Sequence, residues 1–303
     1  MPDSGAFRSE TAVLKTVLSD FPQTSLLKSG ALSDPDVRFD FETVEPVHKA
    51  FAPMVRKGAY DLCELAIVTA LQAVAYGRPV IMLPAVVSSR FQRQCIISAA
   101  KRGPLNPTKL AEMKIGVRAY TQTTGMWVRA HLEEDYGLPV GQMHWVTQDP
   151  AHVEQYSDPS NVEHVGKGES LPDMLLSGAL DAVIMGNDLP KGDDFIPVIP
   201  DSAAKDRAWW EKHGFMPINH MVAVSKEAAE RAPEAVRAAY GLLVDAQAAT
   251  RVPAGEPSKT MIGFEQLRGP VEFTIGHCRR QGLLRGDLSV DDVLGPAAAL
   301  LGA

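Results

Sequence analysis

The chain has 303 residues, with 30 Lys and Arg against 37 Asp and Glu, so its formal net charge is -7 at pH 7. With 45% hydrophobic and 22% charged residues it is not generally disordered, because this apolar content can offset the entropy lost on folding. The acidic balance argues against a nucleic-acid-binding protein, three cysteines are too few for a disulfide framework, and no apolar run is long enough to cross a bilayer.

Short apolar runs alternate with helical patterns through the first half of the chain, which is typical of an α/β fold with a largely parallel sheet. Residues 37–44 alternate apolar and polar side chains, as a half-exposed strand does. Residues 61–65 predict a short strand, followed by a helix over 66–76 that ends at Gly77. Further strands are predicted over 12–18, 80–87, 95–99 and 114–117, and helices over 22–28, 47–56 and 107–113.

A second unit is predicted to begin near residue 118. Residues 123–136 predict a helix ended by Gly137, and the polar stretch 148–169 has no periodicity and is expected to be a surface loop. We expect His152 and His164 in this loop to be solvated. The unit continues with strands over 144–147, 181–185 and 195–199 and helices over 171–178 and 201–213.

The strand predicted over 219–224 returns to the first unit and is followed by helices over 226–230, 233–249 and 265–281. We therefore expect a discontinuous first lobe, residues 1–117 and 215–303, with an inserted second lobe, residues 118–214. Length alone is consistent with about two domains. In such folds ligands tend to bind at the carboxyl ends of strands, in the cleft between the lobes.

Polar side chains lie at the ends of the predicted strands. Asp20 follows the first strand and Glu64 the third, while Arg90 and Arg93 lie in the polar segment 88–94 between two apolar strands. Arginine side chains and helix N-terminal N–H groups are the usual means of holding a small carboxylate. The sequence therefore predicts one carboxylate site at this rim. Its other candidates are Tyr120, Thr123, Thr124, Asn187, Asn219 and His220.

The sequence contains no GxGxxG, GxxxxGK[ST], GxSxG or HExxH pattern, so nucleotide cradles, hydrolase elbows and helix-borne zinc sites are not supported. Its eight histidines form no tight pair and its three cysteines no CxxC. We expect no cofactor and assign no metal ligand, although the sequence does not exclude the binding of a divalent metal ion.

The same segments carry a family resemblance. Its clearest marks are residues 60–65 (YDLCEL), 89–93 (SRFQR) and 217–220 (PINH), with Tyr120 and Thr123 between them. On these marks the chain resembles the 4,5-dihydroxyphthalate decarboxylases, within the type 2 periplasmic-binding-protein superfamily. The resemblance implies a two-lobed α/β fold, with two mixed or parallel sheets, helices on both faces and an interlobe cleft.

The resemblance also implies decarboxylation of a hydroxylated aromatic dicarboxylic acid such as 4,5-dihydroxyphthalate. Arg90 and Arg93 would hold carboxylates, and His220 would donate the proton to the ring carbon that loses CO2, since histidine titrates near neutral pH. Glu64 would orient a ring hydroxyl or handle protons itself. From the second lobe the anion site would be completed by Tyr120, Thr123 and Thr124.

Two other functions stay open at this point. The chain could be a non-catalytic solute-binding protein that delivers a small organic acid to a transporter, or another soluble enzyme on this fold, such as the futalosine-pathway enzymes of menaquinone synthesis. The odd cysteine count and an N-terminus without signal-peptide character favour a cytoplasmic enzyme over an exported binding protein. The resemblance implies that this enzyme acts in aromatic-acid breakdown, in phthalate degradation. We expect the protein to bind a small-molecule carboxylate and neither a nucleic acid nor a membrane. The sequence is compatible with a homo-oligomer.

Overall fold

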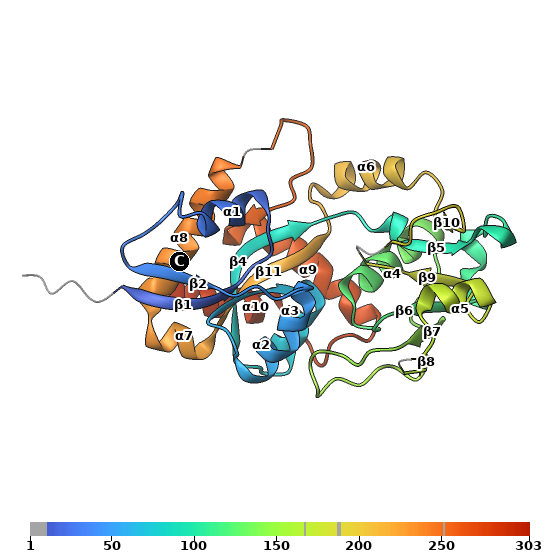
Figure 1. Cartoon of the computed structure of the whole chain (residues 1–303), viewed down its shortest axis with the longest axis horizontal. Helices are drawn as coiled ribbons and strands as arrows, with labels where there is room; N and C mark the ends of the chain where they lie inside the picture. The colour runs from blue at the N-terminus through green and yellow to red at the C-terminus, as the bar shows by residue number, and fades with distance from the viewer. Residues whose placement is uncertain (1–10, 167, 187–188, 251) are drawn as a thin grey trace, which may run out of the picture.

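The computed structural model describes residues 11–166, 168–186, 189–250 and 252–303. These residues form two six-stranded sheets, one after the other along the long axis of the molecule (Figure 1). Each sheet contains both parallel and antiparallel strand pairs. The predicted α/β class with two mixed sheets is therefore confirmed.

The first sheet has the order β12-β4-β11-β3-β1-β2. Strand β1 pairs in parallel with β2 and β3, whereas β11 runs antiparallel to both β3 and β4. The two long strands β4 and β11 lie together at the centre of this sheet. The bounds are β1 Ala12–Val17, β2 Val37–Phe41, β3 Leu62–Ala66, β4 Val80–Ser89, β11 Ile218–Ser225 and β12 Met261–Ile262.

Helices cover both faces of the first sheet. One apolar cluster joins Leu14, Leu62 and Val222 of the sheet to Val236 and Leu242 of α8. A second cluster, on the opposite face, includes residues of α2 and α3. The bounds are α1 Pro22–Lys28, η1 Val47–Ala50, α2 Phe51–Lys57, α3 Ile67–Ala75, α7 Lys226–Arg231, α8 Pro233–Ala249, α9 Phe264–Arg280 and α10 Val290–Leu301.

The second sheet has the order β10-β5-β9-β6-β7-β8, with β6 parallel to β7 and β9, and β5 antiparallel to β9 and β10. Its strands are β5 Ile96–Ala99, β6 Lys114–Val117, β7 His144–Thr147, β8 Val162–His164, β9 Ala182–Ile184 and β10 Phe195–Pro197. Its helices are η2 Arg93–Cys95, η3 Ala100–Arg102, η4 Pro107–Glu112, α4 Thr123–Tyr136, α5 Leu171–Ser177 and α6 Ser202–His213.

The chain passes from the first sheet to the second directly after β4 and returns immediately before β11. The two crossing segments are joined where the Arg90 N–H donates a hydrogen bond to the Pro217 carbonyl oxygen, at 3.1 Å. The lobe boundary predicted at residue 117 is therefore too late, because β5 and β6 belong to the second sheet. The return falls between α6 and β11, next to the predicted position.

The two sheets share one apolar core. A single cluster of buried side chains includes Leu65 of β3, Trp127 of α4 and Ile275 of α9. The Trp127 indole N–H donates to the carbonyl of Ile218 at 2.7 Å, so α4 is tied to the strand that returns to the first sheet. Within the described residues, none of the helices has both the length and the apolar character needed to span a membrane.

Candidate functional site

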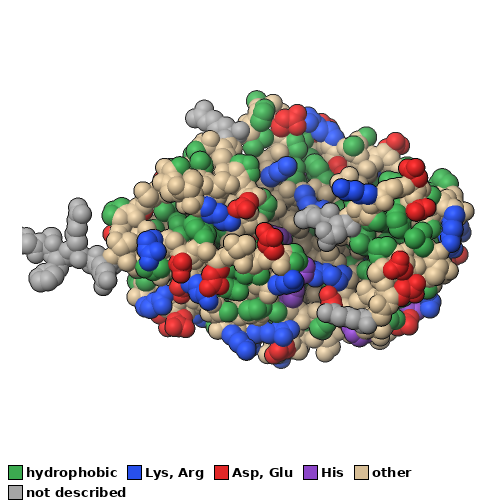
Figure 2. Space-filling model, viewed as in Figure 1, with side chains coloured by type: hydrophobic (Ala, Val, Ile, Leu, Met, Phe, Trp, Pro, Cys, Tyr) green, Lys and Arg blue, Asp and Glu red, His purple; other side chains and the backbone are tan. Residues whose placement is uncertain are grey.

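A cleft of about 360 Å³ lies between the two sheets and is lined by residues of both. This volume is in the range of cavities that bind small organic molecules. Figure 2 shows histidine side chains beside lysine or arginine side chains near the middle of this face. Among the described residues that line the cleft there is no Asp or Glu, and five carry basic side chains. These are His48, Arg90, Arg118, His152 and His220.

Arg90 supplies a positive charge to the cleft. It follows β4, and its guanidinium donates to the Thr124 hydroxyl at 2.6 Å and makes a longer contact of 3.5 Å to Cys95 Sγ. Its Nε is buried without a hydrogen-bond partner among the described residues. A half-buried guanidinium with an unused, buried N–H donor favours an anionic ligand, which can accept that hydrogen bond.

The N-terminus of α4 adds a second element that favours anions. The lining residues Thr121, Gln122, Thr123 and Thr124 form the start of this 14-residue helix, and the Gln122 side chain does not cap it. The first N–H groups of a helix lack intrahelical acceptors and carry the positive end of its dipole. Helix α4 therefore presents N–H donors beside Arg90.

His220 and Glu64 form a hydrogen-bonded pair at the centre of the first sheet. Strands β11 and β3 lie side by side, and His220 Nδ1 lies 2.8 Å from Glu64 Oε1. The register of β11 against β4 is irregular around His220, and such bulges re-aim side chains. The His220 side chain lines the cleft and is 15% exposed, whereas the Glu64 side chain is 0% exposed and does not line it.

Glu64 is held in its ionised form. Burial by itself would raise the pKa of this carboxyl, but hydrogen bonds from His220 and from the backbone and hydroxyl groups of Ser19 outweigh it and lower the pKa below its ordinary value. A carboxylate accepts hydrogen bonds only, so His220 Nδ1 must carry the proton that lies between them. The other ring nitrogen of His220, Nε2, can then exchange a proton with a ligand.

His152 also belongs to the cleft, although the sequence predicts it to be solvated. Its Nδ1 lies 2.9 Å from the Thr69 hydroxyl, and its ring stands edge-on to Phe51 at a centroid distance of 5.7 Å. Burial, and next the charges of Arg118 and other basic neighbours, lower its pKa to about 4. The residue follows β7 of the parallel part of the sheet, so the strand-end rule used for the other candidates could have found it.

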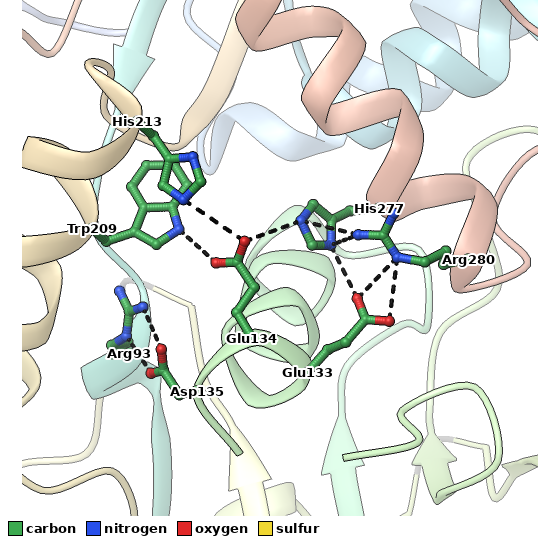
Figure 3. A network of polar contacts seen from close by, with 8 residues as sticks. All are labelled: Arg93, Glu133, Glu134, Asp135, Trp209, His213, His277 and Arg280. Atoms are coloured by element: carbon green, nitrogen blue, oxygen red, sulfur yellow. Dashed lines mark hydrogen bonds and ion pairs between the residues drawn. The ribbon is translucent and has the colours of Figure 1, made fainter. Parts of the chain in front are cut away.

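Arg93 is a structural residue, contrary to the expectation that it binds substrate. Its side chain is 1% exposed and forms ion pairs with Asp135 at 2.8 Å and with Asp206 at 2.7 Å. Figure 3 shows the contact with Asp135, which lies in the last turn of α4. The N-terminal end of the same helix lines the cleft. The polar segment around Arg93 looks exposed in the sequence, but η2 turns this side chain into the interior between α4 and α6.

Three other predicted site residues do not line the cleft. Tyr120 is buried, its hydroxyl donates to the Gln281 carbonyl oxygen at 2.9 Å, and its ring stacks under Arg129. The Asp20 side chain is 80% exposed and pairs with Lys28 at 2.6 Å. Glu64 reaches the cleft only through His220, so it cannot itself orient a ring hydroxyl.

The remaining predictions are mixed. Thr123, Thr124 and Asn219 line the cleft together with Arg90 and His220, and their contact with a substrate stays a prediction. Asn187 lies outside the described residues. Among the described residues no group of three or more His, Cys, Asp and Glu side chains is arranged to hold a metal ion.

No family model matches this chain. It is 31% identical over 223 residues to a 4,5-dihydroxyphthalate decarboxylase of Comamonas testosteroni, over 67% of this chain and 66% of that protein. A protein of the same name from Pseudomonas putida is 32% identical over 167 residues, over 50% of this chain and 64% of the relative. The matches thus span just under two thirds of the length of these relatives.

Solved structures with the same fold include two sulfonate-binding proteins. The periplasmic aliphatic sulphonate binding protein SsuA from Escherichia coli has a TM-score of 0.59 at 12% identity, over 94% of this chain and 92% of its own. The alkanesulfonate-binding protein SsuA from Xanthomonas axonopodis pv. citri, bound to MOPS, has a TM-score of 0.55 at 14% identity, over 96% and 99% of the two chains. At these identities the likeness shows the fold alone. The chain is thus similar in sequence to 4,5-dihydroxyphthalate decarboxylases and has the two-lobed fold of periplasmic binding proteins.

Proposed function

We propose that the protein decarboxylates a hydroxylated aromatic dicarboxylic acid of the 4,5-dihydroxyphthalate type. The observation that carries this proposal is a cleft lined by the Arg90 and Arg118 side chains and, among the described residues, by no acid, with the hydrogen-bonded pair of His220 and Glu64 beside it. Such a cleft attracts a dianion and offers it a proton donor. The names of the two curated relatives support the same reaction.

Arg90 and the N-terminus of α4 would bind the carboxylates of the substrate. The guanidinium is already fixed by the Thr124 hydroxyl, so its remaining N–H groups are oriented before the ligand arrives. Pre-oriented donors lose little entropy on binding and keep the ring in one position. The contact with Arg90 would account for substrate binding. Decarboxylation also needs a group that donates a proton to the ring.

His220 would donate the proton that replaces the carboxylate. In 4,5-dihydroxyphthalate each ring carbon that bears a carboxylate is para to a ring hydroxyl, whose lone pair pushes electron density onto that ring carbon. Protonation there by His220 Nε2 forms a ring C–H bond. The electron pair of the C–COO⁻ bond then returns to the ring as CO2 leaves, and His220 regains a proton from solvent. Glu64 holds the imidazole ring in place through its 2.8 Å hydrogen bond to Nδ1.

The fold also supports a non-catalytic function, because its solved relatives include sulfonate-binding proteins. Turnover separates the two. The purified protein, with and without a chelator, is incubated with 4,5-dihydroxyphthalate, and both CO2 and the ring product are measured. We expect turnover that falls at least about 100-fold in His220→Asn, since general acid catalysis contributes roughly 10²–10⁴-fold.

Arg90→Ala tests binding in the same assay. Its KM should rise roughly 10- to 100-fold, because a hydrogen bond to a charged group contributes about 1.5–3 kcal/mol. Arg237→Ala is the matched control, since this half-exposed arginine pairs with Glu234 within α8, away from the cleft. Tight binding of the acid without any CO2 would favour the solute-binding function instead. A cytoplasmic location and a place in phthalate breakdown stay predictions.

A further inference from the structure

The hydrogen bond between His152 and Thr69 crosses the cleft. Thr69 lies on α3, which covers the first sheet, and His152 lies in the loop that follows β7 of the second sheet. Arg56 of α2 fixes the backbone of this loop, because its Nε donates to the His152 carbonyl oxygen at 2.8 Å and its Nη1 pairs with Glu154 at 3.0 Å. The imidazole is therefore held at both its backbone and its ring.

His152 and His220 flank the same phenyl ring. The Phe51 ring lies edge-on to His220 at a centroid distance of 5.3 Å and edge-on to His152 at 5.7 Å. All three residues line the cleft. A substrate ring that receives its proton from His220 can therefore place the substituent on its opposite side near His152.

The two histidines differ in their partners, and this difference decides what each can bind. His220 faces an ionised carboxylate, whereas His152 faces a neutral hydroxyl and has Arg118 and Arg56 among its charged neighbours. Burial and these positive charges lower the pKa of His152 to about 4, so its imidazole is neutral near pH 7. A neutral imidazole bonds well to a hydroxyl group, which can both donate and accept, and the nearby positive charge favours a hydroxyl with phenolate character.

We propose that His152, positioned by Thr69, is the residue that selects substrates with a ring hydroxyl group, through a hydrogen bond to the hydroxyl para to the departing carboxylate. This inference rests on the proposed function and names the part of the substrate that each side of the cleft recognises. Arg90 and the start of α4 bind the carboxylates, which any phthalate carries. His152 binds the group that distinguishes a hydroxylated phthalate from phthalate itself.

The test compares dissociation constants for phthalate and 4,5-dihydroxyphthalate by calorimetry, in wild-type protein and in His152→Phe and Thr69→Val. The wild-type protein should prefer the dihydroxy acid. His152→Phe keeps an aromatic ring but loses the hydrogen bond, so its Kd for the dihydroxy acid should rise about 5- to 10-fold, with that for phthalate changed less than about 2-fold. Thr69→Val should give a smaller shift in the same direction, and it tests the inference if His152→Phe does not fold.

His164→Phe is the matched control, because His164 is an exposed histidine whose Nδ1 lies 3.4 Å from the Thr147 hydroxyl, outside the cleft. It should leave both constants unchanged. Equal affinity of the wild-type protein for the two acids, or unchanged preference in both cleft variants, would overturn the inference. Absence of CO2 release would refute the proposed function alone, since the ratio of the two dissociation constants still measures hydroxyl recognition.

Discussion

Replacing Glu64 with Gln should show whether this carboxylate positions His220 for catalysis or is only a buried structural group. The carboxylate accepts three hydrogen bonds, from the Ser19 N–H at 2.7 Å, the Ser19 hydroxyl at 2.8 Å and His220 Nδ1 at 2.8 Å. The Gln side chain has one oxygen and one NH2 group in place of the two carboxylate oxygens. Its NH2 group would therefore face a hydrogen-bond donor of Ser19 or His220, and no hydrogen bond could form there. The imidazolium of His220 also loses its counter-charge.

The expected loss follows from these contacts. A hydrogen bond between charged groups contributes about 1.5–3 kcal/mol, so kcat of Glu64→Gln should fall roughly 10- to 150-fold. KM should change little, because Glu64 is 0% exposed and does not line the cleft. Steady-state CO2 release gives both constants, and thermal unfolding shows whether the variant is folded.

Ser19→Ala is the matched comparison for this variant. It removes one hydroxyl donor but keeps the carboxylate and its bond to His220, so its kcat should fall less than about 10-fold. A folded Glu64→Gln variant with wild-type kcat would refute the reasoning, because His220 would then work without its carboxylate partner.

Two predictions concern stability. Arg93→Met should lower the free energy of unfolding by about 3–5 kcal/mol in urea titrations, because it leaves the half-buried carboxylate of Asp135 and the buried carboxylate of Asp206 without their cation, while KM of the folded fraction stays unchanged. A large rise in KM would instead make Arg93 a substrate ligand. Stability should also fall as the pH is lowered from about 6.5 towards 4, since burial and the charge of Arg280 hold the pKa of His277 at about 4 and the unfolded chain binds more protons in this window. This group alone accounts for up to about 3 kcal/mol, and urea midpoints that are equal at pH 7 and pH 5 would contradict it.

The elements of the second unit illustrate what local patterns can predict. The strand and helix predicted over 114–117 and 123–136 have the same bounds in the structure. The sheet to which a strand belongs could not be predicted in the same way. The strand over 95–99, for example, has the same apolar character as the strands of the first sheet. Its partners β9 and β10 lie far along the chain. The short edge strand β8 and helix α10, which contains Pro296, were not predicted at all.

The candidate site shows the same limit. Placing polar residues at strand ends identified Arg90 and His220, because that rule depends only on local sequence and sheet geometry. It failed for Arg93, whose acidic partners are 42 and 113 residues away and cannot be read from neighbouring positions. The polar composition of its loop predicts an exposed His152, whereas contacts from α2 and α3 leave it half-buried in the cleft.

The measurement that tests the account most directly is product analysis after incubation of 4,5-dihydroxyphthalate with the purified protein in D2O. We expect one CO2 per molecule of substrate consumed, and a dihydroxybenzoate with one deuterium at the ring carbon that lost its carboxylate. His220→Asn should abolish most of this product, whereas Arg237→Ala should not affect it. Binding of the acid by the wild-type protein without CO2 or deuterated product would show that the protein is not a decarboxylase of this acid.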